Sequence, residues 1–415
     1  MERYSEYKDS GEQWMGKIPS HWEVKRWHVL MNENTEQNTD CSVTRQLQFK
    51  YGSIIEKNNQ DEDKEVLETI SKYLVVKPGD IMLNGLNLNY DFVSQRVGQV
   101  AQNGVITSAY ICLRPTGRAN ENYLVYLLKA MDSRKLFHGM GTGVRLTLSY
   151  KELKNVNLVF PPLSEQTAIV TYLDRVTSQL DEAIAQQQRM IDLLNERKQI
   201  IIQHAVTKGL DPKAEMVESG VEWIGMMPKG WKCLPLKRCC SLIRTKALNN
   251  QVNRISLENI VSWKGSFVKT DSVYEGNGIL YKKGDILFGK LRPYLAKVLL
   301  AENEGEALGD FWVMRPNDFV LPNYVKFIFL CYSLIELIDS TTYGAKMPRA
   351  DWNANSKTLI PIPSITEQYK ICEYINQMID YTNSIISKNE HRIALLRERK
   401  QIIINEVVTG KVKVS

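Results

Sequence analysis

The sequence predicts an α+β fold in which two similar mixed α/β domains are joined by two long coiled-coil helices. Three observations support this fold class: one helical motif occurs twice, a second motif also occurs twice, and short strand-like runs lie between them. The helical motif reads LLNERKQIII at 193–202 and LLRERKQIII at 395–404. Glu165 and Glu367 stand at the same offset of 202 residues, so the two copies align without a gap. The chain is therefore expected to be an internal pseudo-two-fold repeat.

The second repeated motif combines tryptophans with glycines and a proline near the start of each half. Ser10, Gly11, Trp14, Gly16, Pro19 and Trp22 recur, at an offset of 209 residues, as Ser219, Gly220, Trp223, Gly225, Pro228 and Trp231. Two tryptophans around a Gly–Pro turn are typical of a packed corner where the chain enters a domain. Base stacking by these tryptophans is the alternative interpretation.

Short alternating apolar runs between the motifs predict β-strands, and a helix is expected after them. The strands are expected at 73–76, 80–83 and 106–113, and the helix at 122–131. The segment KPGDI at 77–81 matches KKGDI at 282–286, but the sequences between such anchors differ strongly. A shared scaffold with different loops is expected when two copies of a fold have different specificities.

These patterns divide the chain into five parts. We expect a first domain at 1–160, a central helix at 161–207, a linker at 208–222, a second domain at 223–360 and a C-terminal helix at 361–410.

Residues 165–206 read as one uninterrupted helix, which at ~1.5 Å per residue is roughly 60 Å long. Gly209 and Pro212 are expected to stop it. Residues at a 4-3 spacing mark a coiled-coil seam: Ile169, Leu173, Val176, Leu180, Ala183, Gln187, Met190, Leu194 and Ile201. The C-terminal helix has Ile371, Ile375, Met378, Thr382, Ile385, Asn389, Arg392, Leu396 and Ile403 at the matching places.

A helix of this length cannot bury such a stripe against one compact domain, so the other long helix is the simplest partner. Gln187 and its equivalent Asn389 lie inside the seam, where a polar residue commonly fixes the register. The pattern leaves parallel and antiparallel pairing open. We favour an antiparallel pair, which would set the two domains at opposite ends.

Composition limits the protein class. The length of 415 residues suggests two to four domains, and the net charge of +6 permits nucleic-acid binding only through a local basic surface. Seven cysteines without a Cys-x-x-Cys pair indicate reduced thiols, not a disulfide framework or a zinc site. There is no apolar run of about 18 residues and no signal peptide at the start. We therefore expect a cytoplasmic protein that binds no membrane.

No catalytic motif was found in the sequence. The glycine-rich segment at 139–143 lacks the lysine of a phosphate-binding loop. The segment FPPL at 160–163 lacks the polar first residue of the corresponding amino-methyltransferase loop, and the five histidines are scattered. We expect no catalytic residue, metal site or cofactor in this chain.

Polar and basic residues in the two divergent regions are the candidates for DNA binding. Arginine and asparagine form paired hydrogen bonds to base edges, while lysine and arginine neutralise phosphates. The candidates are Lys50, Asn84, Asn87, Arg96, Arg145, Arg244, Lys246, Lys290, Arg292, Tyr294, Lys346 and Arg349. Two clusters, at 290–297 and 343–349, are the strongest, and 141–145 is the counterpart of the second cluster in the first half.

Over nearly all of its length the sequence resembles the specificity subunits of type I restriction–modification systems. The matching segments are 161–166 and 361–368 with their helices, SGVEWIG at 219–225 with the following Pro-x-x-Trp, GDILFGKLRPY at 284–294, ITSAYICL at 106–113 and KMPRADW at 346–352. One departure is that PIPSITEQ at 361–368 is two residues longer than PPLSEQ at 161–166.

The resemblance implies a non-catalytic reader of double-stranded DNA. Each of the two domains would be a target recognition domain for one half of a split site, with the helices as spacer and docking surface for two modification subunits. Those subunits would bind S-adenosylmethionine and methylate adenine, and restriction subunits would add ATP- and Mg-dependent activity. The alternatives are a self-contained DNA nuclease or methyltransferase, and a coiled-coil scaffold that binds only protein.

Overall fold

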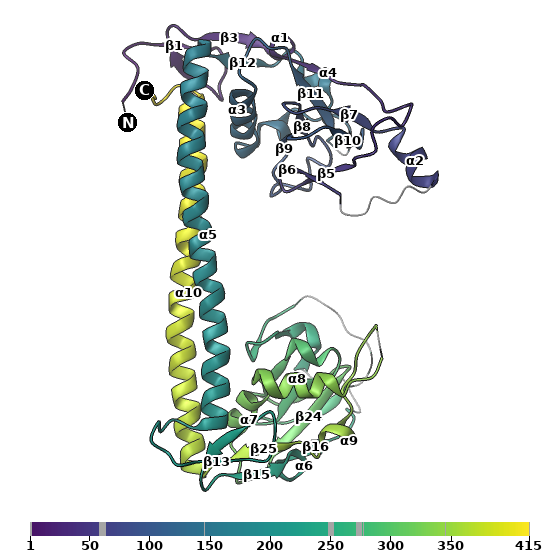
Figure 1. Cartoon of the computed structure of the whole chain (residues 1–415), viewed down its shortest axis with the longest axis vertical. Coiled ribbons are helices and arrows are strands. Elements are labelled where there is room, and N and C mark those ends of the chain that lie inside the picture. The colour runs from purple at the N-terminus through teal and green to yellow at the C-terminus, as the bar shows by residue number, and fades with distance from the viewer. Residues whose placement is uncertain are drawn as a thin grey trace. The chain divides into compact units, whose positions relative to one another are not determined.

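The computed structural model describes residues 2–57, 64–144, 146–247, 253–270, 276, 278–344 and 346–414, which form two compact units. Unit 1 contains residues 1–186 and 392–415, and unit 2 contains residues 187–391. Each unit joins a mixed α/β body to part of α5 (Leu163–Lys208) and part of α10 (Ile365–Val408), the two long helices in Figure 1.

The body of unit 1 is built on a four-stranded antiparallel sheet. Its order is β4 (Met31–Glu33), β11 (Ile111–Pro115), β8 (Ile81–Leu83) and β9 (Val97–Gln99). Two-stranded pairs are β1 (Tyr7–Asp9) with β2 (Lys17–Pro19), β3 (Glu23–Arg26) with β12 (Asn157–Phe160), β5 (Leu47–Lys50) with β6 (Ser53–Glu56), and β7 (Leu74–Val76) with β10 (Gly104–Ile106). Its helices are α1 (Trp27–Leu30), α2 (Lys64–Ile70), α3 (Glu121–Ser133), η1 (Leu136–Gly139) and α4 (Tyr150–Leu153).

The body of unit 2 repeats this sheet and adds different strands around it. The four-stranded order is β16 (Cys240–Ile243), β24 (Phe311–Pro316), β21 (Ile286–Gly289) and β22 (Val298–Leu300). The other strands are β13 (Met216–Glu218) with β14 (Met226–Pro228), β15 (Lys232–Pro235) with β25 (Leu359–Ile362), β18 (Ile260–Val261) with β19 (Ser266–Phe267), and the sheet β17 (Arg254–Ile255), β23 (Gly305–Ala307), β20 (Ile279–Tyr281). Its helices are α6 (Leu236–Cys239), η2 (Leu257–Asn259), η3 (Pro293–Leu295), α7 (Pro322–Ile328), α8 (Tyr332–Ser340) and α9 (Trp352–Asn355).

Of the predicted strands, 73–76 and 80–83 are confirmed as β7 and β8, and α3 confirms the helix at 122–131. The prediction of a single strand at 106–113 is wrong. This run holds the end of β10 and the start of β11, which belong to different sheets. A turn must separate them because one straight strand cannot pair with both sheets.

A buried indole joins each body to its long helix. Trp22 and Trp231 are buried, and their Nε1–H groups donate to Glu165 Oε2 at 2.9 Å and to Glu367 Oε2 at 3.0 Å. The packed-corner interpretation is therefore confirmed for both copies. In unit 1, burial raises the pKa of Glu165, but hydrogen bonds from Trp22, His21 and Tyr4 outweigh this effect and leave the pKa lowered.

The glutamine that follows each of these glutamates makes a second joint. Gln166 and Gln368 are fully buried, and each side-chain oxygen accepts from a backbone N–H of the body at 2.8 Å, that of Asn120 and that of Leu321. The repeated Glu-Gln pair is therefore structural: it satisfies buried backbone groups where helix and body meet.

The long helices are continuous, as predicted, and antiparallel. In unit 1, Lys400 near the end of α10 bonds Asp181 in the first half of α5 at 2.6 Å. In unit 2, Lys198 near the end of α5 bonds Asn383 in the first half of α10 at 3.1 Å. These two pairs show that the helices run in opposite directions. The predicted end of the central helix is also confirmed, because Gly209 directly follows α5 and has a left-handed backbone with φ 71°.

The predicted seam is wrong at one position in each helix. Met190 is 48% exposed and Arg392 is exposed, whereas their neighbours Ile191 and Ile393 are buried. Either residue of each pair fits an approximate 4-3 spacing, but the observed arrangement buries an isoleucine in both helices and leaves Arg392 in solvent. The cost of removing the arginine from water therefore favours the isoleucine at this position of the seam.

The indole–carboxylate bond gives a stability prediction. We expect Trp22→Phe to lower the free energy of unfolding by about 1 to 2 kcal/mol more than Trp27→Phe, measured by urea denaturation. Both side chains are fully buried in unit 1, but Trp27 Nε1 has no hydrogen-bond partner in the described structure. An equal loss in the two variants would show that the bond to Glu165 contributes nothing.

Candidate nucleic-acid interface

One edge of the four-stranded sheet gathers the candidate residues of unit 2. Ile243 at the end of β16 pairs with Val313, and Gly289 at the end of β21 pairs with Phe311 at the start of β24. The residues that follow β16 and β21, and the residue that precedes β24, therefore emerge at the same edge. These residues are Arg244, Lys290 and Asp310.

The two strongest predicted clusters lie side by side at this edge. The backbone N–H of Arg292 donates to Pro348 O at 2.7 Å, and that of Ala350 donates to Lys290 O at 2.9 Å. Tyr343 and Arg349 exchange two backbone hydrogen bonds of 3.2 and 3.0 Å. The loops at 290–297 and 343–349 thus form one surface, which we call the unit 2 loop surface.

Most predicted residues of unit 2 are accessible. Exposed side chains are those of Arg244, Lys246, Arg292, Tyr294, Lys346 and Arg349. Lys290 is partly exposed, and its Nζ lies 3.6 Å from Asp310 Oδ1. Arg349 Nη2 donates to Asp310 Oδ2 at 2.9 Å. Cations outnumber this single carboxylate, so the surface can attract phosphates.

Unit 1 has the same loop arrangement with different residues. Leu148 N–H donates to Gly85 O at 2.9 Å, and Leu88 N–H donates to Leu146 O at 3.2 Å, which hold the loops at 84–96 and 141–147 together. Asn87 in this loop and Arg292 in unit 2 occupy equivalent exposed positions, and both have left-handed backbones, with φ of 52° and 50°. Each unit therefore presents a different exposed side chain, that of Asn87 or that of Arg292, at an equivalent place on the loop.

The remaining candidates of unit 1 differ in accessibility. Lys50 is exposed near the tip of the β5–β6 hairpin, with its Nζ 5.9 Å from the centre of the Tyr51 ring. Asn84 is half-buried, and its side-chain oxygen accepts from Leu86 N–H, so the amide is committed in part to the loop itself. Arg145 lies outside the described residues.

The structure contradicts a direct DNA contact for Arg96. Its side chain is fully buried, and the guanidinium donates to the carbonyl oxygens of Asn84, Leu86 and Asp91 at 2.6–3.0 Å. The equivalent cation of unit 2, Lys297, is also used internally and donates to Leu257 O at 2.6 Å. Arg96 therefore shapes the 84–96 loop from inside.

Sequence analysis missed three exposed apolar side chains on the loops of unit 1, which are Phe92, Val93 and Val144. They lie beside exposed residues of the predicted regions, which are Tyr51 and Tyr90 in unit 1 and Tyr343 and Met347 in unit 2. Large apolar residues at loop tips are available to stack on bases or contact thymine methyl groups. Apolar residues flanked by Asn, Asp and Gly in a predicted loop were the signal that could have found them.

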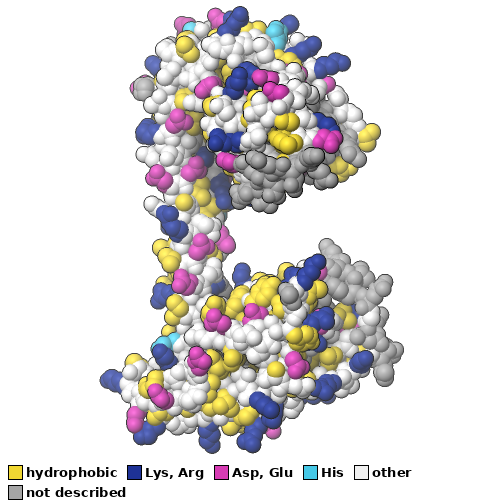
Figure 2. All heavy atoms as spheres, turned by 45° about the vertical axis from the view of Figure 1, so that its right-hand side comes forward, with side chains coloured by type: hydrophobic (Ala, Val, Ile, Leu, Met, Phe, Trp, Pro, Cys, Tyr) yellow, Lys and Arg dark blue, Asp and Glu magenta, His cyan; other side chains and the backbone are white. Residues whose placement is uncertain are grey.

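Basic side chains do not form one continuous face in the view of Figure 2, where Lys and Arg are interspersed with Asp and Glu. This distribution agrees with the mild net charge of +6.

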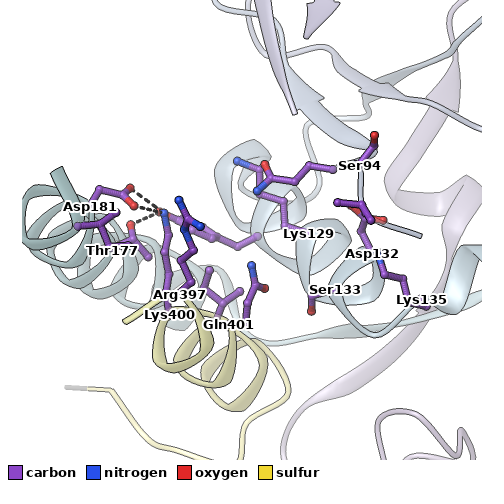
Figure 3. A pocket seen from close by; sticks show the side chains of 15 residues that line it. Ser94, Lys129, Asp132, Ser133, Lys135, Thr177, Asp181, Arg397, Lys400 and Gln401 are labelled. Atoms are coloured by element: carbon purple, nitrogen blue, oxygen red, sulfur yellow. Dashed lines mark hydrogen bonds and ion pairs between the residues drawn. The ribbon is translucent and has the colours of Figure 1, made fainter. Parts of the chain in front are cut away.

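A hollow of about 710 Å³ lies in unit 1 where α3 faces α5 and α10 (Figure 3). Lys129, Asp132, Arg397 and Lys400 line it, and Lys400 is bonded to Asp181. Burial lowers the pKa of Lys129, and the charge of Lys400 lowers it further. Asp132 Oδ1 is buried with no hydrogen-bond partner in the described structure. Val93, Ser94 and Gln95, at the end of the 84–96 loop, also line the hollow.

Metal and membrane features are not found in the part of the chain that the structure describes. Within that part, no group of three or more His, Cys, Asp or Glu residues is arranged to hold a metal ion. No described helix is long and apolar enough to cross a membrane.

Known proteins share this architecture. A family model described as the type I restriction modification DNA specificity domain matches residues 22–190. The match covers most of unit 1, and unit 2 has the same sheet order and the same Trp–Glu joint. A specificity subunit serves in DNA recognition and is not itself the enzyme, so it needs no catalytic cofactor of its own.

Relatives match along nearly the whole chain. The type I restriction enzyme MjaVIII specificity subunit of Methanocaldococcus jannaschii is 23% identical over 422 residues, covering 96% of this chain and 94% of that protein. The EcoDI specificity subunit of Escherichia coli is 20% identical over 312 residues, covering 70% and 69%. A chain in a solved structure of a type I restriction–modification system has the same fold, with a TM-score of 0.69 at 13% identity, over 95% of this chain and 99% of that one.

Proposed function

We propose that this chain reads a split double-stranded DNA site, with one half-site for the loop surface of each unit. One observation carries the proposal: the same sheet edge presents two hydrogen-bonded loops in both units, but the side chains on those loops differ. A common scaffold with different contacts is what two unlike half-sites require. On this proposal the recognition domains are residues 1–160 and 223–360, with the linker at 208–222.

The long helices, at 161–207 and 361–410, would set the spacing between the half-sites. The continuity of the helices supports this role, because α5 is a single helix of 46 residues and α10 a single helix of 44 residues. Two helices paired along a hydrophobic seam resist bending and can fix a distance.

The long helices would also dock two modification subunits. Leu193 and Ile200 are each 60% exposed in unit 2, and their repeat equivalents Leu395 and Ile402 are 49% and 46% exposed in unit 1. Residues seven apart lie on one helix face, and exposed apolar patches mark interaction sites. A patch that occurs once per unit, built from the same residues, suits two copies of one partner.

The charged part of the repeated motif contributes less to this surface than the sequence suggested. Lys198 and Lys400 face the other long helix, as their bonds to Asn383 and Asp181 show. Glu196, Arg197, Glu398 and Arg399 remain exposed and would surround the apolar patches.

The complete system would then act in the cytoplasm. The modification subunits would bind S-adenosylmethionine and methylate adenine, and restriction subunits would use ATP and Mg. No observation on the described residues gives comparable support to a self-contained nuclease or methyltransferase, or to a scaffold that binds only protein.

A domain exchange tests the two-half reading. Residues 23–160 are replaced by the corresponding segment of a relative, and the chain is co-expressed with its modification subunit. We expect sequencing of methylated adenines to show a bipartite site in which one half changes and the other is retained. A change in both halves, or a site without two halves, would contradict the proposal.

A paired insertion tests the spacing role. Seven residues inserted after both Gln187 and Asn389 keep the 4-3 phase and add ~10 Å to each helix. We expect the gap between half-sites to grow by about three base pairs, because B-DNA rises 3.4 Å per pair. Four-residue insertions, which disturb the phase, serve as control and should lower stability. An unchanged gap with the seven-residue insertions would exclude the helices as the spacer.

The docking patches are tested by stoichiometry. We expect Leu193→Ser with Ile200→Ser to leave one modification subunit bound instead of two, as measured by native mass spectrometry. The variant Leu395→Ser with Ile402→Ser should have the same effect, and all four changes together should leave none. Asn195→Ser, at an exposed polar position between the unit 2 pair, is the matched control. Two subunits retained in every variant would exclude these patches.

A further inference from the structure

We propose that Arg349 reads a guanine in the half-site of unit 2, and that Asp310 is the positioning residue that orients its guanidinium. The inference rests on the proposed function and adds the base that one residue recognises. It depends on how Arg349 is held, on which of its donors stay available, and on the charge of its neighbour.

The backbone of Arg349 is fixed on two sides. It bridges Tyr343 within its own loop and Leu291 in the neighbouring loop. Ala350, the next residue, donates its N–H to Lys290 O at 2.9 Å. A side chain that starts from such a fixed point loses little further freedom on binding, which favours a directional contact over a diffuse one.

The guanidinium of Arg349 is held by one hydrogen bond, and its other donors remain available. It makes one bond, from Nη2 to Asp310 Oδ2 at 2.9 Å, and the side chain is 45% exposed. Arg315 shows the contrast: its Nε and Nη2 both donate to the buried carboxylate of Asp285, at 2.7 and 2.8 Å. Arg315 is a closed structural pair, whereas Arg349 keeps donors for a second partner.

The carboxylate favours a base over a phosphate as that partner. Asp310 lies between Lys290 and Arg349 and is itself partly exposed. A phosphate that approached Arg349 would be repelled by this negative charge. The major-groove edge of guanine presents the uncharged acceptors O6 and N7, which arginine binds with two hydrogen bonds. Lys346, on the same loop and exposed, has no carboxylate partner in the described structure and suits a phosphate.

Unit 1 cannot make this contact. The positions equivalent to Asp310 and Arg349 are Ala109 and Thr147, as the paired strands and the repeat offset show. The guanine read by Arg349 should therefore lie in the half of the site that changes when unit 2 is exchanged.

The test uses the complete complex with its modification subunit and three single-residue variants. Arg349→Lys keeps the charge but loses the two-donor fork, so we expect affinity for the native site to fall about 10- to 100-fold and one guanine to become dispensable. Asp310→Asn should relax the same position to a smaller extent. Lys346→Ala, the matched control, should weaken all sequences equally and reduce the salt dependence without changing the site.

A modified base makes the assignment direct. Replacing that guanine with 7-deazaguanine removes the N7 acceptor, so it should weaken the native complex and have little effect on the Arg349→Lys complex. A uniform loss across all sequences for Arg349→Lys would mean a phosphate contact and would overturn the inference. So would a unit 2 half-site without guanine. Either result leaves a bipartite site intact, whereas failure of the proposed function would show as no bipartite site at all.

Discussion

The joint between each body and its long helix is the constraint on which the rest of the structure depends. A buried indole donates to a glutamate, Trp22 to Glu165 and Trp231 to Glu367. The glutamine that follows each glutamate accepts a hydrogen bond from a backbone N–H of the body. A tyrosine hydroxyl reinforces each joint. The hydroxyl of Tyr123 is within hydrogen-bond distance of Val159 O and Val408 O, and that of Tyr324 is within hydrogen-bond distance of Pro361 O and Val206 O. These buried polar contacts have a single satisfying geometry, so they fix how each body is attached to its helices.

The rigid joint allows the loops to vary. Each body is built on a four-stranded sheet of the same order, held by an equivalent ion pair, Arg114 with Asp80 and Arg315 with Asp285. The loops beyond the sheet edge carry little of the core, so their residues can change without loss of the fold. Unit 1 presents mainly asparagine and apolar side chains there, and unit 2 presents a basic set organised around Asp310. Specificity can therefore diverge while the attachment stays constant.

Equal residue types proved to have unequal roles once their surroundings were known. Arg96 and Arg349 were both candidates for DNA contact, but one is enclosed by three carbonyl oxygens and the other is exposed with one partner. Nothing in the local sequence separates them, because each is an arginine in a predicted polar loop. Burial depends on which distant segments cover the side chain. A list of polar loop residues therefore predicts the surface as a set but not the role of each member.

The sequence by itself determined the duplication, the two long helices, their stop signals and the packed tryptophan corners. These features depend on periodicity and short-range chemistry, which are written locally in the chain. Only the tertiary structure decided the phase of the seam, where Ile191 and Ile393 replace Met190 and Arg392, and the antiparallel direction of the helices. It also decided which cations stay in solvent. These outcomes depend on pairing between residues up to hundreds of positions apart, and on the cost of burying a charge, which no single segment shows.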